Sequence, residues 1–419
     1  MRRLHFLIIV CLLFSIVLNS NAQIKKGEKI KRGTAGSPSS ARLNINNVST
    51  PIYNNGSSDI TSTGDCGFRY PIGTGKTVFF QTGPLWGGIL NGNWNVGGSA
   101  YRSGLKPGKI LPDGSPESQT LPHVRIYKVR SDYKNFTDDA GKKNLFALEM
   151  LDEGKSADEI YAQYLLDWEQ WPAQYGAPFI DKNNNGIYEP EIDIPGMSEN
   201  PCQTIWFAAN DLDETAVYNL YGSLPLRIEL QATFWALKGY KPEGNTIYRR
   251  YRLINKNDKK IDSMYFCIWS DPDLGAPFDD YIGCDTLLNF GYVYNKGATD
   301  DIYGTTPPAA GFVLLQTPFV KGESNEEADF NFGKKRGYKN TGFTSFFMFS
   351  SGVEADWSDP VQASSNGAKQ FKNLFTGRYS RSGGRVIDYV TGKPTMFMLS
   401  GDPVNKNGWY DGLLHASSD

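Results

Sequence analysis

Oxygen-bearing side chains alternate along one short segment of the chain. Asp181, Asn183 and Asn185 occupy every second position, and Gly186 follows them. Calcium-binding loops take their first ligands from positions 1, 3 and 5, and use a glycine at position 6 for a sharp turn. The next residue contributes its main-chain carbonyl, a role that falls to Ile187 here. The spacing therefore predicts that this segment binds Ca²⁺.

The end of the same segment departs from an EF-hand. Position 9 is Glu189, a direct or water-mediated ligand, but position 12 is Ile192, where an EF-hand has a bidentate glutamate. Asp193 comes next and is the natural substitute. Pro190 and Pro195 prevent a helix from leaving the loop directly. The segment is thus EF-hand-like in ligand spacing only, and the alternative interpretation is an Asn/Gly-rich surface turn.

A second group of carboxylates follows further along the chain. Like charges that are close in sequence repel one another unless they are solvated, protonated or bridged by a cation. Three interpretations stay open: a second calcium site, the acid and the base or nucleophile of a glycosidase, and a solvated turn. Asp211 and Asp213 form a third, weaker cluster. The second group consists of Asp271, Asp273, Asp279, Asp280 and Asp285.

Other catalytic chemistry has little support in the sequence. There is no Gly-x-Ser-x-Gly elbow. His123 and His415, two of the three histidines, stand in no catalytic motif. We therefore predict a calcium-binding protein with a structural, adhesive or cell-surface role, for which no catalysis is identified. The alternative is a carbohydrate-active hydrolase or a glycan-binding module that uses the 271–285 cluster.

The elements that must position these residues are mainly strands. The chain contains 44 Gly, 23 Pro and 13% aromatic residues, a composition typical of many short strands joined by turns. Asn91-Gly92 predicts a hairpin, and the segments 246–254 and 261–270 predict a second one around a polar connection. We expect an antiparallel β-sandwich-like domain with one or two short helices and long loops. Further strand candidates are 311–317 and 342–350.

Helices are expected in only one part of the chain. Ser156 and Glu159 form a capping box, which predicts a helix that runs to about Trp171. A weaker helix is expected between residues 139 and 152.

The first 22 residues have the form of a secretory signal peptide. Arg2 and Arg3 precede an apolar run over residues 7–18, and small residues occupy the cleavage positions up to Ala22. The apolar run is shorter than the roughly 20 residues that span a membrane, and no later segment is long and apolar enough. We therefore predict cleavage after residue 22 and a secreted, extracellular or cell-surface protein without a transmembrane segment.

Composition also divides the rest of the chain. Residues 23–64 are polar and begin with a basic run, which predicts a flexible linker, and residues 65–419 form the β-rich domain, as one unit or two packed subdomains. Loss of Arg2 and Arg3 with the signal peptide moves the formal net charge from −2 to −4. This balance excludes nucleic acid as a partner and leaves glycans or other cell-surface proteins.

Cysteine usage agrees with export. Four cysteines follow the signal peptide: Cys66, Cys202, Cys267 and Cys284. An even number permits two disulfides in an oxidising compartment, with three connectivities. None of the spacings resembles a zinc ligand pair.

Several strings in the chain resemble a family of large, uncharacterised secreted proteins of Bacteroidota and Ignavibacteria-type bacteria. They include residues 176–188, 203–213 and 269–275, and the resemblance covers roughly residues 86–409. It implies export by type IX secretion but no role for individual residues. Relatives often end in a sorting domain, which is not visible in this sequence. Surface attachment is therefore left open, and truncation of the chain is one explanation.

Overall fold

The computed structural model describes residues 39–239, 242–350 and 355–410. The predicted signal peptide and the basic run of the predicted linker lie outside these described residues. Within them, no helix has the length and apolar character needed to cross a membrane.

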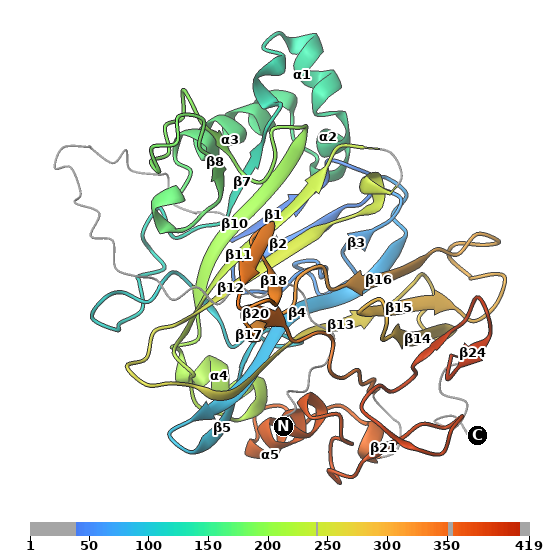
Figure 1. The fold of residues 1–419 in the computed structure, drawn as a ribbon. Coiled ribbons are helices and arrows are strands. Elements are labelled where there is room, and N and C mark those ends of the chain that lie inside the picture. Colours follow the sequence, from blue (N-terminus) through green and yellow to red (C-terminus); the bar gives the residue numbers. More distant parts are fainter. Residues whose placement is uncertain (1–38, 240–241, 351–354, 411–419) are drawn as a thin grey trace.

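Two large antiparallel sheets form the centre of the molecule (Figure 1). The first sheet has β11 at its middle, between β12 and β10, and β10 also pairs with two short strands. Its strands are β12 (Tyr248–Asn255), β11 (Ile228–Leu237), β10 (Cys202–Asn210), β6 (Lys106–Pro107) and β7 (Tyr127–Arg130). The second sheet is built on the long strand β4. Its strands are β13 (Asp262–Pro272), β4 (Thr77–Leu90), β3 (Phe68–Arg69) and β5 (Asn93–Gly98).

The two sheets pack through alternate side chains, as expected for a sandwich. The aromatic rings of Phe234 on β11 and Tyr251 on β12 meet edge to face with centroids 5.7 Å apart. Tyr251 then contacts Phe266 of the second sheet at 5.8 Å. All three side chains are fully buried, and one main core cluster draws on residues from Leu43 to Trp409. The predicted mainly β, sandwich-like fold is confirmed.

Smaller sheets and hairpins complete the β structure. A three-stranded sheet, on the right in Figure 1, consists of β14 (Asp280–Asp285), β15 (Phe290–Asn295) and β16 (Ala309–Val313). The paired short strands are β1 (Ser40–Leu43) with β2 (Thr50–Tyr53), β8 (Phe179–Ile180) with β9 (Ile194–Pro195), β17 (Phe319–Lys321) with β20 (Tyr338–Asn340), β18 (Glu327–Phe330) with β19 (Gly333–Arg336), β21 (Val386–Ile387) with β22 (Pro394–Thr395), and β23 (Gly401–Asp402) with β24 (Asn407–Gly408).

Helices lie at two ends of the sandwich. Figure 1 shows α1, α2 and α3 together at one end, and α4 and α5 at the other. Their bounds are α1 (Asp139–Leu145), α2 (Ala147–Glu153), α3 (Ala157–Glu169), α4 (Glu214–Tyr221) and α5 (Ser365–Phe375). The capping box at Ser156 and Glu159 is present, so the prediction of α3 is confirmed. The weaker helix is two helices, α1 and α2, and the described residues hold five α-helices rather than the expected one or two.

The strand predictions near the turns had mixed outcomes. The Asn91-Gly92 hairpin is confirmed, since Leu90 of β4 pairs with Asn93 of β5. The second predicted hairpin is wrong, because β12 pairs with β11 and β13 pairs with β4. The connection between these strands crosses from one sheet to the other. Both β12 and β13 bury side chains between the two sheets. Their sequences therefore look alike although the two strands do not pair with each other.

Two further predictions need correction. The segment 342–350 forms no strand, since Phe346 makes only an isolated bridge with Phe397. Residues 39–64 are not a linker but part of the fold, because they form β1 and β2 and bury Leu43 and Ile52 completely. The apolar residues of this stretch are few, but they join the core of the whole domain rather than a core of their own.

Candidate functional site

The segment predicted to bind Ca²⁺ is a loop closed by two short strands. β8 enters it and β9 leaves it, and the two strands pair in register, Ile180 with Ile194. The loop is fastened to α3 and the turn after it. The indole Nε1 of Trp168 donates to the Pro190 carbonyl at 2.9 Å, and the Tyr188 hydroxyl donates to the Trp168 carbonyl at 2.7 Å. The helix that precedes the loop therefore positions it.

Inside the loop, Asp181 organises the backbone. Its carboxylate accepts the N–H of Asn185 at 3.2 Å and of Gly186 at 2.7 Å. Asn184 and Gly186 have φ of +57° and +74°, so the chain makes two left-handed turns here. This conformation favours asparagine and glycine, and it explains why the loop has this composition whether or not an ion binds.

The polar side chains of the loop meet at Glu189. The side-chain amides of Asn183 and Asn185 both donate to Glu189 Oε2, each at 2.7 Å. Four oxygen-bearing side chains, including Asp181, are thereby held within one turn of the chain. Ca²⁺ prefers carboxylate, amide and carbonyl oxygens, so the chemistry of this set fits that ion.

The structure places the predicted ligand Asp193 differently. Asp193 is only 2% exposed, and its carboxylate accepts the N–H of Lys182 at 2.9 Å and of Glu189 at 2.8 Å. It ties the two ends of the loop together. The Ile187 side chain is 65% exposed, which leaves only its main chain as a contribution to an ion site.

The five aspartates between residues 271 and 285 do not form one cluster. Asp280 and Asp285 stand at opposite ends of β14, a separation of about 16 Å at the usual rise of a strand. Asp285 accepts the N–H groups of Leu287 and Leu288 and so caps an exposed turn. The turn interpretation fits this residue.

The remaining aspartates of that group lie near β13 and the start of β14. Asp271 accepts the hydroxyl of Tyr101 at 2.8 Å, and burial raises the pKa of Asp271 to about 6. Asp273 contacts the Cys66 thiol, with 3.4 Å between Sγ and Oδ2. Burial and then the neighbouring Asp279 raise the pKa of Asp280 to about 7. Asp271 and Asp273 thus have separate hydrogen-bond partners, whereas Asp279 lies close enough to Asp280 to raise its pKa.

The third cluster is structural. Asp211 is completely buried, and its carboxylate accepts the N–H groups of Leu226 at 3.0 Å and Ile228 at 2.7 Å. Asp213 caps α4 by accepting the N–H of Ala216. Neither carboxylate is directed toward a shared site.

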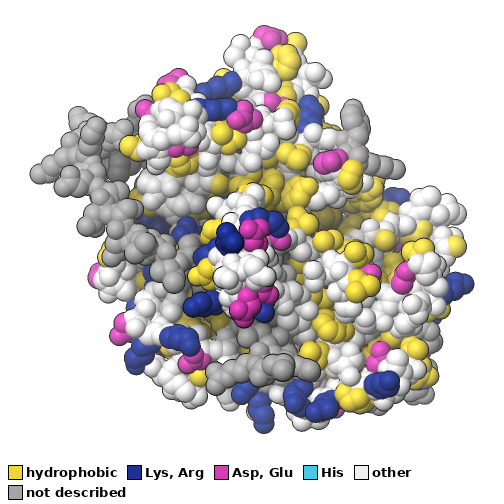
Figure 2. Space-filling view, viewed as in Figure 1, with side chains coloured by type: hydrophobic (Ala, Val, Ile, Leu, Met, Phe, Trp, Pro, Cys, Tyr) yellow, Lys and Arg dark blue, Asp and Glu magenta, His cyan; other side chains and the backbone are white. Residues whose placement is uncertain are grey.

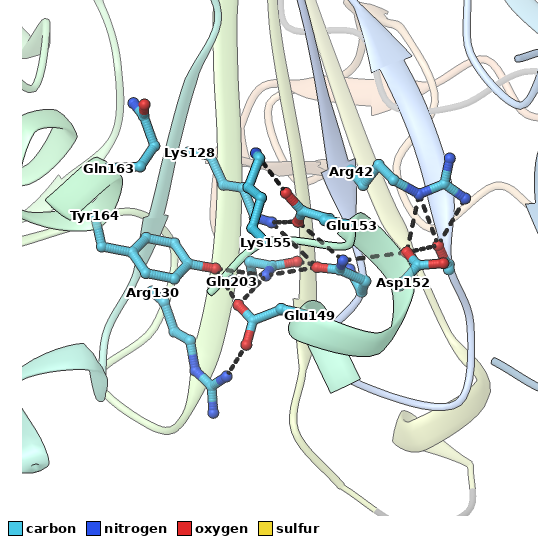
Figure 3. A network of polar contacts seen from close by, with 12 residues as sticks. Arg42, Lys128, Arg130, Glu149, Asp152, Glu153, Lys155, Gln163, Tyr164 and Gln203 are labelled. Carbon is cyan, nitrogen blue, oxygen red and sulfur yellow. Dashed lines mark hydrogen bonds and ion pairs between the residues drawn. The ribbon is translucent and has the colours of Figure 1, made fainter. Parts of the chain in front are cut away.

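Sequence analysis missed a buried polar network between the helices and the first sheet (Figure 3). Glu149 of α2 is fully buried. It accepts from Arg130 at 2.6 Å, from Gln203 at 3.1 Å and from the hydroxyl of Tyr164. A carboxylate with this many donors is satisfied, as buried charges must be.

The same face of α2 carries two more paired acids. Asp152 accepts from Arg42 at 2.9 Å and from Arg69 at 3.1 Å. Burial would raise the pKa of Glu153, but Lys128 at 2.7 Å and the nearby Lys155 lower it to about 2. The network fastens α2 to β1, β3 and the first sheet.

An aromatic cavity was also missed. Trp235 of β11 and Tyr248 of β12 are register partners, and their rings stack 5.1 Å apart at 12°. With the exposed ring of Phe332 they line a cavity of about 1140 Å³. Figure 2 shows hydrophobic side chains on this face beside the charged β18–β19 hairpin. The two rings lie on consecutive strands, and only the register of β11 with β12 brings them together.

The four cysteines that follow the predicted signal peptide lie within the described residues and form no disulfide. Cys202, Cys267 and Cys284 are buried, and Cys66 is half-buried. Burial raises the pKa of the Cys202 thiol to about 11 and of the Cys66 thiol to about 12. The permitted disulfide pairs are therefore not present among these four thiols.

Among the described residues, no group of three or more His, Cys, Asp or Glu side chains is placed to hold a metal ion. An ion in the loop must therefore rely on amide and main-chain oxygens as well as on carboxylates. No family model, no curated protein and no solved structure matches the chain, so neither a family nor a homologue supplies a function for these residues.

Proposed function

We propose that this protein is a secreted, calcium-binding β-rich protein with a structural, adhesive or cell-surface role. The observation that carries the proposal is the convergence of Asn183 and Asn185 on Glu189 within a loop that Asp181 organises. Side-chain amides offer an oxygen as well as a nitrogen. In the structure the Asn183 oxygen accepts the N–H of Asn185 at 3.3 Å and the Asn185 oxygen accepts the N–H of Ile187 at 2.7 Å, so a cation bound beside Glu189 requires both amides to turn.

The donor set also suggests the strength of binding. Asp181 and Glu189 are the two carboxylates that face the loop, and Asn183 and Asn185 are exposed. Few charges and an open site favour weak binding, in the range of about 10⁻⁴ to 10⁻³ M that extracellular modules have. That range suits a protein exported by the signal at residues 1–22, where calcium serves to hold a loop rather than to report a change in concentration.

Glu189→Gln tests the calcium proposal. The change removes one charge but keeps the acceptor that holds Asn183 and Asn185. We expect calorimetry to show calcium binding weakened roughly tenfold or more, the loss that about 1.4 kcal/mol produces. In wild type, calcium at 100 times its Kd should stabilise the fold by about 2.7 kcal/mol.

Glu191→Gln is the matched control, because it removes the same charge from an exposed residue two positions away. It should bind calcium like wild type. Equal binding by wild type and Glu189→Gln would reject the loop as the site.

A second candidate function, glycan binding, is favoured by the aromatic cavity. Ligand sites are concave and mostly apolar, with a few polar groups that set orientation. Here Trp235 and Tyr248 offer flat apolar surface, and Arg250 and Asn331 form a polar pair on the wall, 2.7 Å apart. None of the aspartates between 271 and 285 is among the described residues that line it. The cavity thus supports binding rather than hydrolysis by that cluster.

Trp235→Ala tests this second candidate by affinity electrophoresis in gels that contain soluble glycans. Loss of the stacking surface should abolish any retention while calcium binding is unchanged. Phe278→Ala, whose side chain is 99% exposed, is the aromatic control and should keep retention. Absence of retention by wild type across the panel would reject glycan binding.

A further inference from the structure

Three oxygen atoms at one edge of the three-stranded sheet are buried without a hydrogen-bond partner. They are Asp279 Oδ1, Asp280 Oδ1 and Asn295 Oδ1. Each buried acceptor that lacks a donor costs about 1–3 kcal/mol. Three such acceptors in one place, with two negative charges among them, call for a positive partner.

The three side chains are neighbours. Asp280 is the first residue of β14 and pairs in register with Asn295, the last residue of β15, so the two side chains share a face of the sheet. The amide nitrogen of Asn295 donates to Asp279 Oδ2 at 3.0 Å. One side chain from each strand end and one from the preceding turn therefore meet.

The orientation of the Asn295 amide is fixed. Its nitrogen also donates to the Thr299 carbonyl at 3.0 Å, so both hydrogens are used. The side chain is only 8% exposed. Turning the amide would break both bonds, and its oxygen is consequently held as a free acceptor.

No side chain neutralises these carboxylates. Within the described part of the chain, neither Asp279 nor Asp280 forms an ion pair, and the Lys296 ammonium instead lies 5.5 Å from the centroid of the Tyr281 ring. The neighbouring Asp300 adds negative charge, and its oxygens already accept main-chain N–H groups.

We propose that Asp279, Asp280 and Asn295 bind a calcium ion through their Oδ1 atoms. All three are hard oxygen ligands of the kind Ca²⁺ takes, and waters or main-chain carbonyls complete its usual six to eight. The other oxygen of Asp280 accepts the N–H of Leu274 at 2.8 Å. An ion here would tie the turn after β13 to the ends of β14 and β15.

That tie has a structural consequence. Leu274 is fully buried in a cluster with Val78, Phe79 and Val293. Val78 and Phe79 also line the aromatic cavity. The ion would thus hold the turn that packs behind one wall of the cavity. This site shares no residue with the Asp181 loop, so either one can exist without the other.

Calcium stoichiometry measured by calorimetry on the full chain tests the site. Wild type should bind two ions, and Asp280→Asn and Glu189→Gln should each keep only one site of wild-type affinity. The double variant should keep neither. Asp285→Asn, at the other end of β14, is the matched control and should bind two.

The outcomes separate the two proposals. If Asp280→Asn binds as many calcium ions as wild type, the site at Asp279, Asp280 and Asn295 is overturned and the loop site is unaffected. If Glu189→Gln binds as many as wild type, only the loop site is overturned. Thermal unfolding shows whether each variant is folded. Without calcium, Asp280→Asn should melt at or above the wild-type temperature because a repulsion is removed. With calcium it should show a smaller rise in Tm than wild type, and an equal rise contradicts the site.

Discussion

Asp211 shows how one buried carboxylate can be mistaken for a ligand. It lies in the acidic run that attracted attention in the sequence, yet both of its oxygens accept main-chain N–H groups. It holds the turn before β11 against the end of β10. In this way a carboxylate can accept main-chain N–H groups that lack a carbonyl partner. Burial of its negative charge then lowers the stability of the fold.

That charge predicts a pH dependence. Burial raises the pKa of Asp211 to about 7, although the two N–H groups and Arg227 favour the charged form. The folded-state pKa is above the usual 3.8, so the stabilising contribution is present below about pH 4 and is lost as the pH rises through 7. Asp211→Asn should therefore flatten the fall in unfolding free energy between pH 4 and 7.

Urea unfolding at several pH values measures this slope. Asp213→Asn is the control, because asparagine also caps helices well, and it should keep the wild-type slope. An unchanged slope in Asp211→Asn would contradict the assignment. The lowered pKa of Glu153 acts in a different range, since its contribution is lost only as the pH falls from 4.5 toward 2.

At the scale of elements, the β1–β2 hairpin is the least expected part of the fold. Its sequence is polar, but Leu43 and Ile52 are completely buried, and Arg42 joins the network around α2. The hairpin thus connects the core to α2.

Leu43→Ala tests whether the hairpin contributes to stability. We expect the unfolding free energy to fall by about 2–5 kcal/mol, as for other buried leucines. Leu287→Ala is the matched control, because this leucine is 92% exposed and its loss should change stability by less than about 0.5 kcal/mol. Equal values for the two variants would mean that residues 39–64 are dispensable.

At the scale of the whole molecule, the predictable features are the local ones. The Asn91-Gly92 hairpin and the capping box at Ser156 involve residues a few positions apart, and both are confirmed. The ligand spacing after Asp181 was equally readable, although its ion remains a proposal. A single segment carries enough information for features of this kind.

The features that could not be predicted depend on which strands pair and in which register. Trp235 meets Tyr248 because β11 and β12 are adjacent, and Asn295 reaches Asp279 only through the register of β14 and β15. Asn295 carries no motif of its own. Only the three-dimensional structure shows that its side-chain oxygen is buried without a hydrogen-bond donor.

The pairing of β4 with β13 has a consequence for how the protein is made. Trp86 lies opposite Phe266, so the second sheet closes only after most of the chain has left the ribosome. Contacts between such distant segments slow folding, and until they form, the long strand β4 lacks one partner and is prone to associate with other chains. Export, as proposed, would suit this topology, because a chain that is kept unfolded until translocation ends has both segments available when folding starts.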